Sequence, residues 1–250
     1  MIFAHTWVTM IFMNPKKKIA IAGAIILGLG LVLGLLWYYQ QQGFLKIFPT
    51  TEDRRIKKLL RIDEAKFQPA QGLSEEEFRA EIQKLYERRE QVRQKPEEPV
   101  AWFNFGYQRE FLNDHEGAVG AWEQAFKLQP LNFVTALNLG NTYQYFLKNY
   151  ERAEFYYEKA LALQPSYTSA YQGLLDLYRF NWKEKQNQVE PLLLEAVKND
   201  PANELTYYTA LVEFFAASNE PGKAKLYLLE VKRLQPEVAE ELLETYPSLR

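Results

Sequence analysis

The sequence contains no cysteine and only two histidines, His5 and His115. The absence of cysteine excludes disulfides, thiolate zinc sites, iron–sulfur clusters and a cysteine nucleophile. Two histidines so far apart leave a metal site or a Ser–His pair little to build from. Glycine-rich phosphate loops are missing too, since Gly28 and Gly30 lie inside an apolar run. We therefore predict no catalytic residue, no metal site, no cofactor and no enzymatic activity.

An excess of charge of either sign is also lacking. Thirty Lys and Arg residues stand against 32 Asp and Glu residues, which gives a formal net charge of -2. A surface that binds nucleic acid normally leaves an excess of basic residues, because it neutralises phosphates. We therefore do not expect nucleic acid as a partner. Aromatic residues, in contrast, are plentiful, with 16 Tyr, 16 Phe and 5 Trp.

Residues 19–39 contain no charged residue and consist mainly of Ile, Leu, Val, Ala and Gly. A helix of this length measures about 30 Å, which is enough to cross the hydrocarbon layer of a membrane. Lys16, Lys17 and Lys18 precede the segment, and Trp37 and Tyr38 lie at its far end, where aromatic rings anchor a span. A cleaved signal peptide would need a shorter apolar core and a small-residue cleavage site. We predict an uncleaved transmembrane helix.

The three lysines favour an N-terminus in the cytoplasm and a domain outside it, in a single-pass protein of a bacterial inner (plasma) membrane. Six basic residues that follow the span within about two dozen positions oppose this orientation, but they lie farther away and are mixed with acidic residues. Glycines within the span, such as Gly30 and Gly34, have the spacing of helix-pairing motifs and weakly suggest a homodimer. Residues 1–18 form an N-terminal tail, and Met13 is a more natural beginning than Met1, so we suspect an over-extended start.

The segment 40–72 is predicted to be a juxtamembrane linker. Ile56, Leu59 and Leu60 form a short apolar stripe among basic residues, which predicts a brief amphipathic helix. This helix would lie either on the anionic lipid surface or against the following domain. Residues 73–98 then predict an N-terminal capping helix, because Ser74 and Glu77 have the spacing of a capping box.

Beyond this helix, four prolines recur with separations of 35, 36 and 35 residues: Pro130, Pro165, Pro201 and Pro236. Each proline follows a run with helical periodicity, such as Ala-Leu-Ala-Leu-Gln before Pro165. A fixed period of about this length is the sign of a repeat architecture, in which each unit stacks on its neighbours.

The content of the units resembles the tetratricopeptide repeat (TPR). The first unit has Trp102, Gly106 and Tyr107 in one helical stretch, then Ala118 and Trp122 in the next. The second unit repeats the pattern with Gly140 and Tyr157, whereas the third and fourth fit more loosely. The resemblance implies an all-α fold: a right-handed solenoid of about four helix-turn-helix units (99–132, 133–167, 168–203 and 204–236, together 99–236), closed by a C-terminal capping helix at 237–250.

In this family the first helix of each unit lines a concave groove that binds a peptide or a partner protein. The resemblance places eleven residues there: Phe103, Tyr107, Glu110, Leu137, Asn141, Gln144, Gln172, Asp176, Arg179, Tyr208 and Val212. Aromatic rings would anchor the partner, and Asn and Gln side chains would bond to its backbone. One subclass grips C-terminal carboxylates with Lys and Arg side chains, but Phe103, Ser169 and Gly173 occupy those positions here, so we do not expect that mode.

The sequence therefore predicts a membrane-anchored scaffold that binds a peptide or a partner protein in the groove of the array. The alternative is a purely structural subunit of a cell-envelope assembly for secretion, pili or the cell wall, without recognition in the groove. The fold alone does not choose between these functions.

Overall fold

The computed structural model describes residues 14–42, 50–69 and 72–250. These residues form twelve α-helices and no strand, as the sequence predicts. The chain divides into two compact units, residues Met1–Arg61 and Ile62–Arg250. Residues 1–13, on which the expectation of an over-extended start falls, and residues 43–49 of the predicted linker lie outside the described residues.

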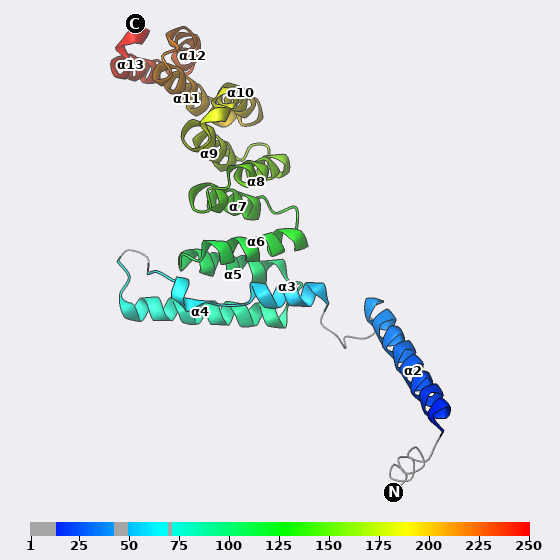
Figure 1. The fold of residues 1–250 in the computed structure, drawn as a ribbon. Coiled ribbons are helices and arrows are strands. Elements are labelled where there is room, and N and C mark those ends of the chain that lie inside the picture. The colour runs from blue at the N-terminus through cyan, green and yellow to red at the C-terminus, as the bar shows by residue number, and fades with distance from the viewer. Residues whose placement is uncertain (1–13, 43–49, 70–71) are drawn as a thin grey trace. The chain divides into compact units, whose positions relative to one another are not determined.

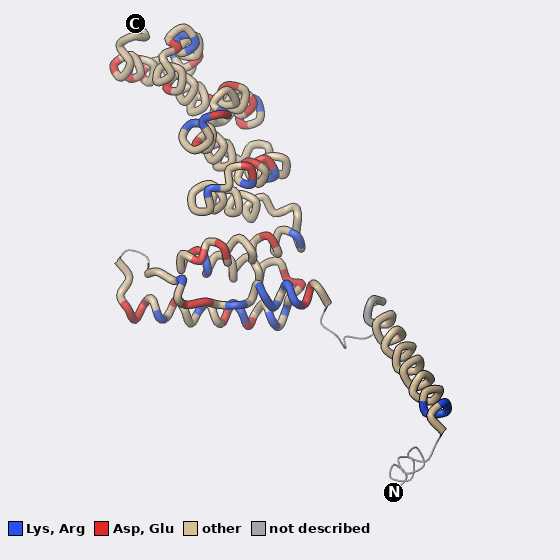
Figure 2. The backbone as a smooth tube through the Cα atoms, in the orientation of Figure 1, with Lys and Arg blue, Asp and Glu red and all other residues tan. Residues whose placement is uncertain are grey.

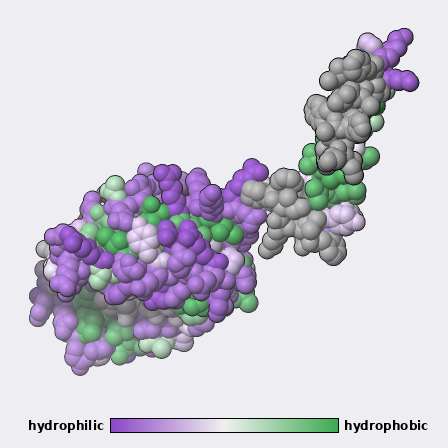
Figure 3. All heavy atoms as spheres, turned by 90° about the horizontal axis from the view of Figure 1, so that it is seen from below, coloured by the Kyte–Doolittle hydropathy of each residue, from purple (hydrophilic) through white to green (hydrophobic). Residues whose placement is uncertain are grey.

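The first unit contains one long apolar helix, α2 (Pro15–Gln41). Figure 2 shows Lys and Arg only at its N-terminal end, and hydrophobic side chains lie on its surface in Figure 3. The stretch Pro15–Tyr39 is long and apolar enough to cross a membrane, and none of its most apolar window is buried. A signal sequence near an N-terminus has the same form.

A second, short helix of this unit, α3 (Thr51–Leu59), occupies the place of the predicted amphipathic helix. Its first turn is closed by a capping box, in which Asp53 N donates to Thr50 Oγ1 at 3.0 Å and Thr50 N donates to Asp53 Oδ2 at 2.7 Å. Acidic residues lie in its first turn and lysines in its last, an order that suits the helix dipole.

The second unit begins with α4 (Glu75–Gln94), which starts at the capping box that the sequence predicts. Ser74 N donates to Glu77 Oε2 at 2.8 Å, and Glu77 N donates to Ser74 Oγ. The helix buries Leu85 and Val92 and packs on α5 (Pro99–Phe111). Because the outward side of α4 is rich in charge (Figure 2), α4 covers the first helix pair and presents a polar surface to water.

Four helix pairs follow and stack in chain order (Figure 1). They are α5 with α6 (His115–Leu128), α7 (Phe133–Tyr145) with α8 (Tyr150–Leu163), α9 (Thr168–Asp176) with α10 (Val189–Asn199), and α11 (Glu204–Ala217) with α12 (Pro221–Leu234). The last helix, α13 (Pro236–Thr245), packs on α12 and buries Ala239 and Leu242. Helices this short are not stable alone in water, so their stability comes from the packing between pairs.

Three of the four pairs turn in the same way. Asn113, Lys148 and Asn219 each follow the first helix of a pair with a left-handed backbone (φ of 63°, 53° and 58°). A side-chain oxygen then caps the second helix in the first two pairs: Asp114 accepts from Gly117 N, and Asn149 accepts from Arg152 N. The chain therefore reverses within a few residues and lays the second helix against the first.

The third pair is built differently. Its first helix, α9, ends after nine residues and continues as a π-helical turn, η2 (Leu177–Asn181), and a 3-10 segment, η3 (Lys183–Gln188). The second helix, α10, then starts late and has Pro191 in its first turn, where the missing N–H is harmless. The third pair is consequently less regular than its neighbours.

Close contacts between glycines and aromatic rings pack the first pair internally and join the second pair to the third. A Cβ added to Gly106 would lie 2.6 Å from the ring of Trp122. The fully buried ring of Tyr157 packs against two glycines, because a Cβ at Gly140 or at Gly173 would lie 2.6 or 2.5 Å from it. Real Cβ contacts are never so short. Since Gly140 belongs to α7 and Gly173 to α9, one ring joins the second pair to the third.

Candidate functional site

The eleven predicted groove residues all lie on the first helices of the pairs or directly after one. Phe103, Tyr107 and Glu110 are on α5; Leu137, Asn141 and Gln144 on α7; Gln172 and Asp176 on α9; Arg179 on η2; and Tyr208 and Val212 on α11. Tyr107 and Gln172 are exposed, and seven others are partly exposed. Gln144 and Val212 are fully buried.

In the first two pairs, the first helices α5 and α7 carry exposed apolar side chains. Tyr107 is 60% exposed and Val100 56% exposed on α5, and Leu131 and Val134 are exposed at the start of α7. Phe103 lies between this surface and the core, with its ring centroid 6.5 Å from that of Trp122. Exposed apolar side chains clustered in this way mark a surface that gains free energy when a partner covers it.

Glu110 is already engaged within the protein. Its carboxylate lies 3.0 Å from His115 Nδ1 and accepts from Thr142 Oγ1 at 3.3 Å. The ring of His115 stacks on that of Phe146, with centroids 3.7 Å apart. These contacts connect the first pair to the second, so Glu110 has a structural task whether or not a partner also reaches it.

The amides on α7 hold the ring of Tyr157. The Tyr157 hydroxyl lies 2.8 Å from Asn141 Oδ1 and 2.6 Å from the amide of Gln144, which also lies 2.7 Å from Asn181 Oδ1. In the orientation that satisfies both ends of this amide, its nitrogen donates to Tyr157 and to Gly173 O, and its oxygen accepts from Leu177 N. Burial raises the pKa of the Tyr157 hydroxyl, so the hydroxyl stays protonated. Gln144 was expected at the groove but belongs to this buried network, because its amide forms hydrogen bonds with the Tyr157 hydroxyl and with the π-helical turn η2. Val212 likewise packs in the core rather than facing the groove.

A hollow of about 360 Å³ lies between α9 and α11. Three predicted residues line it, Gln172, Asp176 and Arg179, beside apolar side chains that include Leu175 and Leu205. Tyr145 donates to Asp176 Oδ2 at 3.1 Å, and burial, with the charge of Asp176, raises the pKa of Tyr145 to about 12. The hollow therefore has apolar walls and a few polar groups, as sites for side chains of a partner do.

Among the residues that line the hollow and were not assigned to the groove from the sequence are Thr206, Thr209 and Glu213 of α11. They lie at positions i, i+3 and i+7 of α11 and so share one face of the helix. This spacing was the available signal. The looser match of the fourth unit to the repeat pattern favours Tyr208 and Val212 as the groove face instead.

The first helices present groups that are suited to recognition. Within the described residues, no group of three or more His, Asp or Glu side chains could hold a metal ion. The side of the first helices has apolar anchors at α5 and α7, an amide at Gln172 and the charged groups of Asp176 and Arg179. These are the parts of a surface that binds a polypeptide segment.

Comparison with known proteins gives a match at one unit and a common fold. The tetratricopeptide repeat family matches residues 135–167, which cover most of α7 and all of α8. No curated protein matches the chain. Among solved structures, the crystal structure of MamA has a TM-score of 0.52 at 14% identity and covers 81% of this chain and 99% of its own.

Two further structures are similar. The MamA RS-1 ArsTM double mutant has a TM-score of 0.50 at 22% identity and covers 63% of this chain and 86% of its own. YrrB, described as a TPR protein with an unusual peptide-binding site, has a TM-score of 0.46 at 18% identity and covers 64% of this chain and 84% of its own. At these identities the likeness to the two MamA structures concerns the fold alone. The chain thus carries a tetratricopeptide repeat at residues 135–167, within a TPR-like solenoid of stacked helix pairs.

Proposed function

We propose that the protein is an interaction scaffold that binds an extended peptide segment of a partner protein along the first helices of its pairs. The observation that carries the proposal is the hollow between α9 and α11, which is lined by Gln172, Asp176 and Arg179, three residues that the repeat pattern assigns to the groove. The apolar surface around Tyr107 supports it, because it supplies a second anchor on the same series of helices. A segment that reaches from α5 to α11 would meet apolar groups first and charged groups later.

We also propose that α2 anchors the scaffold in a membrane, with the N-terminus in the cytoplasm and the helix pairs outside it. The support is the length and apolar surface of α2, with Lys16, Lys17 and Lys18 at its start. Carbonate extraction of membranes, followed by mass spectrometry of the N-terminal peptides, tests the anchor. We expect membrane retention with residues 19–39 present. A mature chain that begins after residue 39 would identify α2 as a signal sequence instead.

Site-specific photocrosslinking in the full-length protein tests the groove. A benzophenone amino acid is placed at Tyr107 or Gln172, and at Phe155 as a control, because Phe155 is an exposed aromatic on the second helix α8. We expect positions 107 and 172 to crosslink the same segment of one partner, and position 155 not to crosslink it. Equal crosslinking from all three positions, or crosslinking from 155 alone, would refute recognition in the groove.

A further inference from the structure

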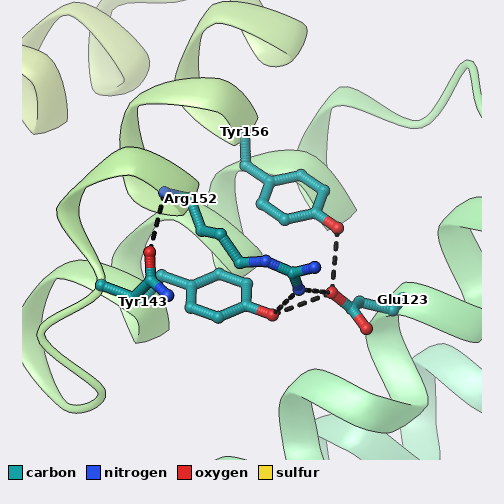
Figure 4. Close-up of polar contacts among 5 residues, drawn as sticks. Glu123, Tyr143, Arg152 and Tyr156 are labelled. Carbon is teal, nitrogen blue, oxygen red and sulfur yellow. Dashed lines mark hydrogen bonds and ion pairs between the residues drawn. The ribbon is translucent and has the colours of Figure 1, made fainter.

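The second helices of neighbouring pairs meet at three junctions: α6 with α8, α8 with α10, and α10 with α12. We call these the first, second and third junction. In the first junction, Glu123 of α6 is the centre of a polar cluster, which Figure 4 shows. Tyr143 and Tyr156 donate to Glu123 Oε1 at 2.8 and 3.1 Å, and the guanidinium of Arg152 pairs with the same carboxylate. The rings of Tyr143 and Tyr156 stack with centroids 5.7 Å apart.

The third junction has a similar cluster around a glutamate at another position, because Glu190 lies eleven residues before Pro201 whereas Glu123 lies seven before Pro130. Tyr227 donates to Glu190 Oε1 at 2.5 Å, and Lys223 pairs with Glu190 at 3.0 Å. Tyr227 lies nine residues before its closing proline and Lys223 thirteen, the same positions as Tyr156 and Arg152 relative to Pro165. A tyrosine and a cation from the later helix thus satisfy a glutamate of the earlier helix at both outer junctions.

The second junction lacks these two side chains. Leu192 and Gln188 lie nine and thirteen residues before Pro201, where the outer junctions have the tyrosine and the cation. The glutamate remains, because Glu158 of α8 has the position that Glu123 has on α6. Among the described residues, Glu158 forms no hydrogen bond and no ion pair. Tyr178 and Lys185 bond instead to Glu154 of α8 at 2.6 Å, and Glu154 lies eleven residues before Pro165, as Glu190 does before Pro201. The second junction thus satisfies Glu154 but not Glu158.

A hollow of about 550 Å³ occupies this junction. Its walls include Leu161 and Leu192, and two carboxylates, Glu158 and Glu195, line it. Its size is within the range of ligand clefts, roughly 300–1,000 Å³. The late start of α10 after η3 accompanies the opening, since Gln188 lies before the helix whereas Arg152 lies within α8.

The electrostatic environment favours a cation in this hollow. Both carboxylates are exposed at the mouth of the hollow. Partial desolvation, and then the charge of Glu154, raise the pKa of Glu158, although Lys185 and Lys159 act in the opposite direction. Glu195 accepts only from the neutral amide of Asn199, at 3.4 Å. Two carboxylates beside an apolar wall suit an arginine, whose planar guanidinium bonds to carboxylates while its aliphatic stem packs on leucine side chains.

We propose that the hollow between α8 and α10 binds an arginine side chain of a partner protein, with the guanidinium at Glu158 and Glu195. The first junction is the internal precedent, because Arg152 and Tyr156 fill the equivalent position there from within the chain. This site lies on the second helices and is separate from the groove of the first helices. A scaffold with both sites would contact partners on two sides of the array.

Binding of N-acetyl-arginine amide to the full-length protein in detergent micelles, followed by ligand-observed NMR, tests the proposal. N-acetyl-citrulline amide is the matched probe, since it has the same shape without the charge. We expect the arginine probe to bind at least about tenfold more tightly than the citrulline probe. Equal affinity, or no binding of the arginine probe up to about 20 mM, would overturn the proposal.

Two variants locate the site. Glu158→Gln combined with Glu195→Gln removes the charges, and Gln188→Arg combined with Leu192→Tyr rebuilds the side chains of the first junction. We expect both double variants to abolish the preference for arginine, and the rebuilt variant also to melt at a higher temperature. Glu123→Gln and Tyr107→Ala are the controls, and both should bind the probe as the parent protein does. If both double variants bind the arginine probe as tightly as the parent protein, or if Tyr107→Ala weakens its binding, the site is not between α8 and α10.

Discussion

The second and third helix pairs lie side by side in the array and solve the same packing problem differently. The second pair turns tightly at Lys148 and fills its junction with Tyr156 and Arg152. The third pair reverses through η2 and η3, and leaves a hollow on the side of its second helix and another on the side of its first. The two hollows both lie beside the irregular pair, and Glu158 of the regular pair lines one of them without a hydrogen bond to any of the described residues. π-helical turns often accompany functional sites.

Removal of the ring that both pairs share should have the largest effect. In Tyr157→Ala, the contacts with Gly140 and Gly173 are lost and the hydrogen-bonding partner of Asn141 disappears. We expect the free energy of unfolding to fall by about 3–5 kcal/mol, measured by urea denaturation. Phe155→Ala is the control on the same helix, and because its ring is exposed the change should be about 0.5 kcal/mol or less. Similar losses in both variants would contradict the role given to Tyr157.

The second largest difference in stability is expected between two glutamines that the sequence assigns to the groove, one in each pair. Gln144 in the second pair is fully buried and hydrogen-bonded, so Gln144→Ala should cost about 1–3 kcal/mol of folding free energy. Gln172 in the third pair is exposed, so Gln172→Ala should change stability by about 0.5 kcal/mol or less. The same urea experiment measures both. The reverse order would mean that Gln144 faces the groove after all.

The equivalent glutamates Glu123 and Glu158 should respond with different signs. Glu123→Gln weakens two tyrosine hydrogen bonds and an ion pair, and should lower the free energy of unfolding by about 1–2 kcal/mol. Glu158→Gln removes a charge without a partner, so stability at neutral pH should stay the same or rise. Thermal unfolding monitored by circular dichroism compares the two. A clear loss of stability in Glu158→Gln would show that the carboxylate already has a cation.

The smallest expected effect is on the pH dependence of stability. The pKa of Glu158 is raised from 4.5, mainly by partial desolvation, so the folded state holds this proton more tightly than the unfolded state. Its ionisation therefore lowers stability as the pH rises from 4.5 through the folded pKa. The hydrogen bond from Tyr227 lowers the pKa of Glu190, so its contribution is present above 4.5 and is lost as the pH falls through the folded pKa.

Denaturation of Glu158→Gln and Glu190→Gln at several acidic pH values checks these signs. Relative to the parent protein, Glu158→Gln should gain stability as the pH increases, and Glu190→Gln should lose it. Equal slopes for the two variants would mean that the two carboxylates have the same environment.

The regular parts of the fold follow from local sequence. Prolines close the second helices, Ser74 and Glu77 start α4, and Gly106 and Gly140 allow the rings of Trp122 and Tyr157 to approach. Each of these signals acts within a few residues or at a fixed period, so a single sequence reveals it. The all-helical solenoid could be predicted for this reason.

The parts that escaped prediction depend on contacts between units. The π-helical turn after Asp176 has no local signal such as glycine or proline, and it is stabilised in part by Gln144 from another helix. Gln144 has the polarity of a surface residue, so periodicity alone could not place it in the core. The hollow at the second junction could have been found only by aligning Gln188 and Leu192 with Arg152 and Tyr156, because it results from two missing side chains rather than from a motif.

The ring of Tyr157 also has a consequence for motion. Because it lies against glycines of two consecutive helix pairs, neither pair can open without exposing the same buried surface. The centre of the array should therefore exchange its amide hydrogens as one cooperative block, while fraying starts at the ends. A partner that grips the centre would hold the most rigid part of the scaffold and would lose little entropy on binding.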